Sequence, residues 1–138
     1  MLFDFDSLEK RLPQWDWAKF IDNEALDGYD RKEILERFLD YNSKNKDEKE
    51  FNRKLYYYCS FVKNCTYSAG FFYNISRFYD SHNTIPSINK KQIAIDSLVR
   101  HRFQRALDSL DYIIENYDRN FEKFGFRDFI KKCSLYKS

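Results

Sequence analysis

The sequence has few of the residues that build and punctuate β-sheets. Its 138 residues include only two valines, two threonines, three glycines and two prolines. Val and Thr favour strands, and Gly and Pro favour the tight turns between strands. Their scarcity, beside plentiful Leu, Lys, Glu and Arg, predicts an all-α fold. A chain of this length is expected to form a single all-helical domain over residues 1–138.

Long apolar runs are also absent. No stretch approaches the 18 consecutive apolar residues that a membrane-spanning helix needs, and MLFDFDSLEK is acidic where a secretory signal would be basic. We therefore expect a cytoplasmic protein with no membrane contact.

Cysteine is scarce and irregularly spaced. Cys59, Cys65 and Cys133 are odd in number and include no C-x-x-C pair. This argues against both a disulfide framework and a zinc site, and predicts buried or half-buried thiols. We expect no metal and no cofactor.

Sequence motifs of catalysis are missing as well. The chain has no paired catalytic acids, no Ser/His/Asp set, no H-E-x-x-H and no glycine loop that could cradle a phosphate. The expectation is a protein that is not an enzyme.

The longest regular feature is a hydrophobic period of three and four residues between about 90 and 118. Its members are Ile95, Val99, Phe103, Ala106, Leu110, Ile113 and Tyr117. This spacing places all seven on one face of a helix about 44 Å long. We expect a bundle of about six or seven helices packed around this long helix.

The remaining helices are predicted from caps and apolar spacing. Asp30-Arg31-Lys32-Glu33 resembles a capping box, and Gly125 is suited to a left-handed C-terminal cap. A short helix is expected before Pro13. The further expected ranges are 14–26, 30–41, 45–64, 67–79 and 128–136, with exposed connections within the polar stretch 41–50 and at 81–89.

Charge is unevenly distributed along the chain. Residues 1–50 carry 9 basic and 14 acidic side chains, whereas residues 51–105 carry 9 basic and 2 acidic ones. The molecule should therefore have an acidic end and a basic middle. Either the two segments neutralise each other on folding, or one of them meets a charged partner.

The basic cluster from Arg100 to Arg105 lies in the first half of the long helix, and Asp108, Asp111 and Glu115 lie in its second half. This order opposes the helix dipole, which favours acids first and bases last. The arginines could pair with carboxylates of the first 50 residues, or they could contact phosphates or acidic groups outside the protein.

Aromatic residues are concentrated between Phe51 and Tyr79. Tyr56, Tyr57 and Tyr58 are consecutive, and three consecutive helical residues span about 200° of the helix circumference, so at least one should reach the surface. Exposed tyrosines near basic residues are typical of protein-binding surfaces.

These observations favour stoichiometric binding of another protein. The leading hypothesis is an inhibitor or immunity-type protein that neutralises a toxin, such as a basic nuclease. The predicted contacts combine acidic and aromatic side chains: Trp15, Asp16, Asp22, Glu24, Asp27, Tyr56 and Tyr57.

Two alternatives remain open. The segment from Arg77 to His82 resembles the R-x4-6-H motif of HEPN ribonucleases, although Phe78 replaces the polar residue that usually follows the arginine. The resemblance implies an RNA-binding or RNA-cleaving module in which Arg77 and His82 act with Arg100 and Arg102. The second alternative is a structural subunit of a larger assembly.

Overall fold

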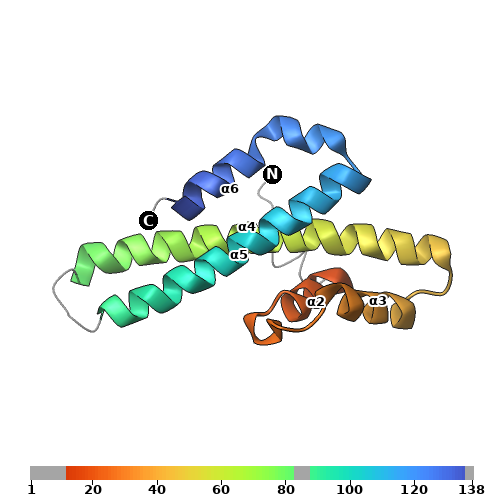
Figure 1. The fold of residues 1–138 in the computed structure, drawn as a ribbon, viewed down its shortest axis with the longest axis horizontal. Coiled ribbons are helices and arrows are strands. Elements are labelled where there is room, and N and C mark those ends of the chain that lie inside the picture. The colour runs from red at the N-terminus through yellow and green to blue at the C-terminus, as the bar shows by residue number, and fades with distance from the viewer. Residues whose placement is uncertain (1–11, 83–87, 136–138) are drawn as a thin grey trace.

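The computed structural model describes the backbone of residues 12–82 and 88–135, and the side chains of residues 12–23, 25–66 and 100–130. Within these ranges the chain forms five α-helices and two 3₁₀ helices and contains no strand, so the predicted all-α class is confirmed (Figure 1). The elements are α2 (Pro13–Ile21), η1 (Glu24–Leu26), α3 (Arg31–Asn42), α4 (Lys46–His82), α5 (Ile88–Asn116), η2 (Arg119–Phe124) and α6 (Phe126–Leu135). The short helix expected before Pro13 lies outside the described residues.

The longest helix is α4, with 37 residues, and not the predicted helix near 90–118. The two helices expected at 45–64 and 67–79 are one continuous helix. No proline interrupts this segment, and a single glycine inside a helix costs only about 1 kcal/mol relative to alanine, so Gly70 does not end it. Neither α4 nor any other helix in the described ranges is both long and apolar enough to cross a lipid bilayer.

The fold is organised around α4 and α5, which lie side by side (Figure 1). Helix α4 also contacts α2 and α3, whereas α5 also contacts η2 and α6. In Figure 1 the α2–α3 pair lies on one side of the two long helices, and η2 with α6 lies on the other. The prediction of a single organising helix therefore becomes a central pair of helices, with one layer on either side.

Two hydrophobic cores occupy the two sides. The first joins α2 and α3 to α4 and consists of Trp15, Trp17, Ala18, Ile21, Leu35, Leu39, Tyr56 and Cys59. The second joins α4 and α5 to α6 and consists of Phe61, Phe103, Ala106, Leu110, Ile113 and Ile130. Each layer thus has its own apolar contact with the central pair.

Helix α2 is shorter than predicted and ends at Ile21 instead of near Leu26. The Asn23 side chain accepts a hydrogen bond from the amide of Ala25 at 2.9 Å, which stabilises a turn that competes with the helix. Gly28 then takes a φ of +96°, a value that residues with a Cβ rarely adopt.

Helix α3 begins as its cap predicted. The carboxylate of Asp30 accepts hydrogen bonds from the amides of Lys32 and Glu33 at 3.0 and 3.3 Å. Asn45 caps α4 in the same way by accepting from the amide of Glu48 at 2.8 Å. The connection between the two helices is therefore shorter than the polar composition suggested.

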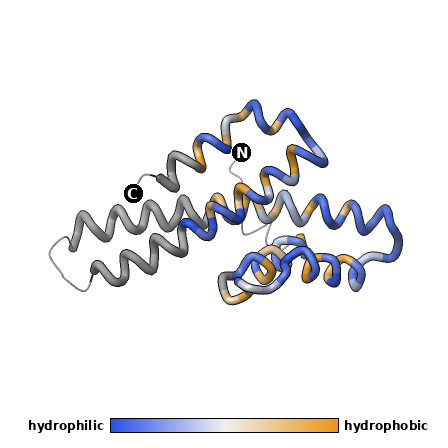
Figure 2. Tube along the Cα trace, in the orientation of Figure 1, coloured by the Kyte–Doolittle hydropathy of each residue, from blue (hydrophilic) through white to orange (hydrophobic). Residues whose placement is uncertain are grey.

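The predicted inner face of α5 is confirmed where side chains are described. Phe103, Ala106, Leu110 and Ile113 are each at most 4% exposed, and Tyr117 is half-buried. Apolar and polar residues alternate along the described part of α5, as expected for a helix with one buried face (Figure 2). The predicted positions Ile95 and Val99 lie outside the described side chains.

The end of the chain folds back through η2 into α6. Asp118 caps η2 by accepting from the amide of Asn120, and Gly125 ends it with a φ of +68°. The left-handed conformation predicted for Gly125 is confirmed, and it lets α6 begin directly at Phe126.

Candidate functional site

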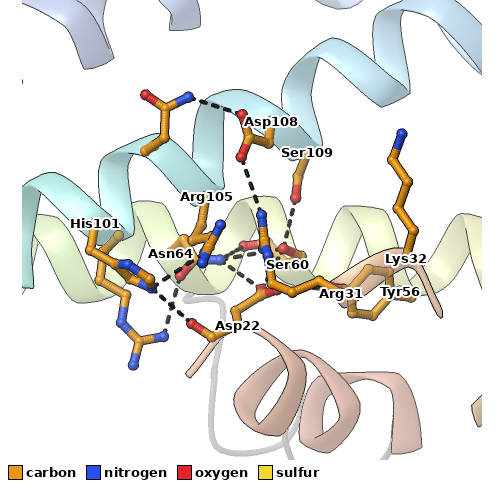
Figure 3. A network of polar contacts seen from close by, with 12 residues as sticks. Asp22, Arg31, Lys32, Tyr56, Ser60, Asn64, His101, Arg105, Asp108 and Ser109 are labelled. Atoms are coloured by element: carbon orange, nitrogen blue, oxygen red, sulfur yellow. Dashed lines mark hydrogen bonds and ion pairs between the residues drawn. The ribbon is translucent and has the colours of Figure 1, made fainter. Parts of the chain in front are cut away.

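A buried carboxylate, that of Asp22, lies where α2 meets the central helices (Figure 3). Its side chain is fully buried and accepts hydrogen bonds from Tyr56 Oη at 2.7 Å, Ser60 Oγ at 2.6 Å and Asn64 Nδ2 at 2.9 Å. The guanidinium of Arg31 approaches the same carboxylate at 3.4 Å. Because a buried charge is tolerated only when it is paired and hydrogen-bonded, these four donors account for its position.

The Asp22 network reaches both long helices. Ser60 lies 2.7 Å from Ser109 on α5, and Arg31 contacts Asp108 of α5 at 3.3 Å. Burial and the Asp22 carboxylate raise the pKa of Tyr56 well above its ordinary value, so its phenol stays protonated and acts as a donor. These contacts connect α2, α3, α4 and α5 through polar groups.

A second set of contacts surrounds Asp27, next to the Asp22 network. Arg105 Nη2 donates to Asp27 Oδ1 at 2.6 Å, and His101 Nδ1 lies 3.2 Å from Asp27 Oδ2. The His101 Nε2 atom lies 3.2 Å from the carbonyl oxygen of Asp22. Arg105 therefore pairs with a carboxylate of the first 50 residues. Of the two possibilities that the sequence left open, internal pairing or contact with an outside group, Arg105 follows the first.

The other arginines of the cluster are placed differently. Arg102 is 8% exposed and donates to Asn64 Oδ1 at 3.3 Å, whereas Arg100 is exposed. The alternative nucleic-acid site therefore has one of its arginines inside the molecule. The side chains of its other two members, Arg77 and His82, lie outside the described residues.

Charges of α3 and α4 also neutralise each other. Glu36 pairs with Arg53 at 2.5 Å and with Lys49 at 2.9 Å, and Lys49 also pairs with Asp40 at 2.6 Å. Burial raises the pKa of Glu36, but the hydrogen bonds and charges of Arg53 and Lys49 outweigh this effect and lower it. Glu36, from the acidic segment 1–50, is therefore paired both with Lys49 of the same segment and with Arg53 of the basic segment 51–105.

Three of the predicted partner contacts lie inside the molecule. Trp15 and Tyr56 are 6% and 4% exposed and belong to the first core, and Asp22 is fully buried. They do not offer a surface to a partner in this structure. The sequence missed this because α2 buries Gln14, Trp15, Trp17, Ala18 and Ile21 over more than one stripe.

The remaining predicted contacts are nearer the surface. Asp16 is exposed, Asp27 is 54% exposed but paired, and Tyr57 is half-buried. The Tyr57 ring stacks on Tyr112 with centroids 3.7 Å apart. The side chain of Glu24 lies outside the described residues. As expected of three consecutive residues, Tyr57 and Tyr58 are more exposed than Tyr56.

An exposed aromatic surface that the sequence did not indicate lies across α2 and α3. Phe20 is 53% exposed and Tyr41 is 90% exposed, while the half-buried ring of Phe38 lies 5.7 Å from that of Phe20. Phe38 and Tyr41 are three residues apart and share one side of α3. We call Phe20, Phe38 and Tyr41 the aromatic patch. Asp16, four residues before Phe20, lies on the same side of α2.

A cavity of about 310 Å³ opens between α3, α4 and α5. One wall carries Arg31 and Lys32, and the other carries Asp108, Asp111 and Glu115. The rest of the lining consists of Leu35, Tyr56, Tyr57, Ser109 and Tyr112. The cavity thus combines aromatic surface with charges of both signs, and its size is within the range of ligand-binding clefts.

The described cysteines and acids do not form a metal site. Cys59 is buried and Cys65 half-buried, as predicted, and burial raises the pKa of the Cys59 thiol to about 11. Cys133 lies outside the described side chains. In the part of the chain whose side chains are described, no three His, Cys, Asp or Glu residues gather closely enough to hold a metal ion.

The aromatic patch and the cavity are therefore the two surfaces from which a function can be inferred. The Asp22 network, in contrast, is enclosed and connects helices. Comparisons with protein-family models, with curated proteins and with solved structures found no match to this chain.

Proposed function

We propose that this protein acts by stoichiometric binding of another protein, as an inhibitor or immunity-type protein that neutralises a toxin. The observation that supports the proposal most directly is the aromatic patch. Large aromatic side chains are enriched among the residues that contribute most to protein–protein affinity, and Phe20 and Tyr41 leave most of their surface in water.

The charge of the patch surroundings suits a basic partner such as a nuclease. Asp16 is exposed beside Phe20, and Glu33 on α3 is also exposed, although it pairs with Arg37. Exposed charges at the rim of an interface mainly speed association and select the partner. Fewer acidic side chains are available to a basic partner than the sequence suggested, because Asp22, Asp27 and Glu36 form ion pairs within the protein.

The test is purification of the tagged full-length protein from its own cells, followed by measurement of the dissociation constant with the protein recovered. We expect one partner at a one-to-one ratio. The double variant Phe20→Ala/Tyr41→Ala should weaken binding by about 30-fold or more, since each anchor residue of an interface contributes about 1 kcal/mol or more. The matched control is Phe129→Ala, a 62% exposed aromatic on α6 that should bind as the wild type does.

Neutralisation requires a second measurement. Co-expression of the partner with the wild-type protein should restore growth of a host in which the partner alone is toxic, and the double variant should fail to do so. Absence of a stoichiometric protein partner would contradict the proposal, as would full affinity of the double variant. The RNA-binding alternative and the structural-subunit alternative stay predictions, and a low-salt gel shift with single-stranded RNA distinguishes the former.

A further inference from the structure

The cavity between α3, α4 and α5 has walls of opposite charge. Arg31 and Lys32 come from the first turn of α3, while Asp108, Asp111 and Glu115 come from α5. The three acids and Tyr112 follow the spacing i, i+3, i+4 and i+7, which places them on one face of the helix. The cavity therefore has an acidic wall that is continuous over two helical turns.

Most of these charges have internal partners. Arg31 contacts both Asp22 and Asp108, and Asp111 forms an ion pair with Arg127. Asp108 also accepts a hydrogen bond from Gln104 at 2.9 Å. The two remaining charged residues of the cavity walls are Lys32 and Glu115. Neither forms an ion pair within the described part of the chain. Figure 3 shows the Lys32 side chain extending away from Asp22.

The balance of charge around the cavity is negative. With the partners Asp22 and Arg127 included, four carboxylates face three cationic side chains. Glu115 is exposed near the C-terminal end of α5, where the helix dipole disfavours an acid. Its carboxylate is thus the charge that an added cation would stabilise most.

Aromatic surface lies beside this acid. The stacked pair Tyr57–Tyr112 lines the cavity, and Tyr112 is three residues from Glu115 on the same face of α5. Burial and Tyr112 raise the pKa of Tyr57 to about 12, so its phenol is neutral at physiological pH. A tyrosine pair and a carboxylate that line the same cavity suit a group that is both planar and cationic.

We infer that this cavity receives a cationic side chain, an arginine guanidinium, from the partner protein. The guanidinium would donate to the Glu115 carboxylate while its alkyl stem contacts Leu35 and the tyrosine rings. Lys32 on the opposite wall repels the same cation and limits affinity. The inference rests on the proposed function only in assigning the guest side chain to a protein partner, and it uses a surface separate from the aromatic patch.

The experiment titrates the full-length protein with N-acetyl-L-arginine methylamide and follows backbone amide shifts by NMR. The isosteric neutral probe is the corresponding citrulline derivative, and the probe of opposite charge is the glutamate derivative. Shifts should saturate around residues 31–35 and 108–115, and the arginine probe should bind about fivefold more tightly than the citrulline probe.

Two variants with opposite expected signs test the charge argument. Glu115→Gln should weaken arginine binding about fivefold, and Lys32→Gln should strengthen it about twofold. Asp47→Asn, which removes an exposed acid in the first turn of α4, is the control and should leave binding unchanged. Both cavity residues are exposed, so the variants are expected to fold, and thermal unfolding monitored by circular dichroism checks this.

Several results would overturn the inference: equal affinity for arginine and citrulline, tighter binding of the glutamate probe, shifts that map elsewhere, no binding up to the solubility limit, or an unchanged affinity in Glu115→Gln. These outcomes are distinct from failure of the proposed function. A protein partner that binds Glu115→Gln as tightly as wild type would refute the cavity as a subsite while leaving the aromatic patch supported.

Discussion

The layers on the two sides of α4 and α5 are attached to the central pair in different ways. On the α2–α3 side, the buried carboxylate of Asp22 takes hydrogen bonds from three α4 side chains, and Arg105 of α5 pairs with Asp27. On the η2–α6 side, aromatic rings do most of the packing. The ring centroid of Phe61 lies 6.2 Å from that of Phe121 and 5.4 Å from that of Phe126.

The two kinds of contact differ in how precisely they define the position of each layer. Hydrogen bonds and ion pairs are directional, so the Asp22 network is satisfied in one placement of α2. Ring packing is less directional, and the stabilisation that it provides is roughly proportional to the apolar area removed from water. One side should thus be sensitive to loss of a single charge, and the other to loss of side-chain volume.

The largest effect is expected when Asp22 is replaced. Asp22→Ala should lower the free energy of unfolding by about 3–5 kcal/mol, because it removes the carboxylate that accepts from the buried hydroxyls of Tyr56 and Ser60 and one of the acceptors of the Asn64 amide. The measurement is urea denaturation at pH 7. Asp16 of α2 is exposed, and Asp16→Ala should change stability by less than about 0.5 kcal/mol. Equal losses in the two variants would mean that the network does not attach α2.

The next effect concerns the η2–α6 side. Ile130 is 1% exposed, and Ile130→Ala should cost about 2–5 kcal/mol through lost burial and the cavity left behind. Phe129→Ala, at the adjacent 62% exposed position, provides the control with little change. The loss in Ile130→Ala should not depend on salt concentration. A strong salt dependence would show that charges, not packing, attach α6.

A smaller effect is expected at the turn before α6. Gly125→Ala should destabilise the protein by about 1–2 kcal/mol, because alanine is strained at a φ of +68°. Nothing lies within 4 Å of the added Cβ, so backbone strain is the cause. Gly125→Asn should lose less stability than Gly125→Ala, since asparagine tolerates the left-handed conformation better than alanine does. Chemical denaturation of both variants measures the difference, and identical losses would point to a steric contact instead.

The smallest effect belongs to the exposed ion pairs of the α3–α4 surface. The pKa of Glu36 is lowered in the folded state, so its pairing stabilises the protein above the ordinary glutamate pKa of 4.5 and the contribution is lost as pH falls through the lower folded value. Glu36→Gln should therefore cost at most about 1 kcal/mol at pH 7, because the side chain is 45% exposed. The difference from wild type should disappear in acid, where Glu36 is protonated in the folded protein as well. A difference that persists there would identify packing as its origin.

Local features were predictable because they depend on neighbouring residues. The Asp30 cap, the Gly125 turn and the inner face of α5 follow from side-chain chemistry and helical spacing within a few positions. The end of α2 was not predictable in the same way. A hydrogen bond from the amide of Ala25 to Asn23 competes there with an otherwise acceptable helix.

The residues of the candidate surfaces were harder to predict from the sequence. Trp15 and Tyr56 have the composition of interface anchors, but their burial depends on how α2 packs against α4. Phe20 and Tyr41 resemble core residues in sequence, yet both are exposed to water. The buried faces of their helices are formed by other residues, such as Ile21 in α2 and Leu39 in α3. Residue type alone does not distinguish a core aromatic from an exposed one.

The sequence by itself determined that this protein is helical, where most helices begin, and which face of α5 is buried, because these properties arise from propensity and periodicity along the chain. The tertiary structure decided that α4 lies beside α5, that Asp22 is enclosed by donors from α4, and that an acidic wall of α5 faces the first turn of α3. These outcomes depend on contacts between residues 30 to 80 positions apart, which local patterns do not encode.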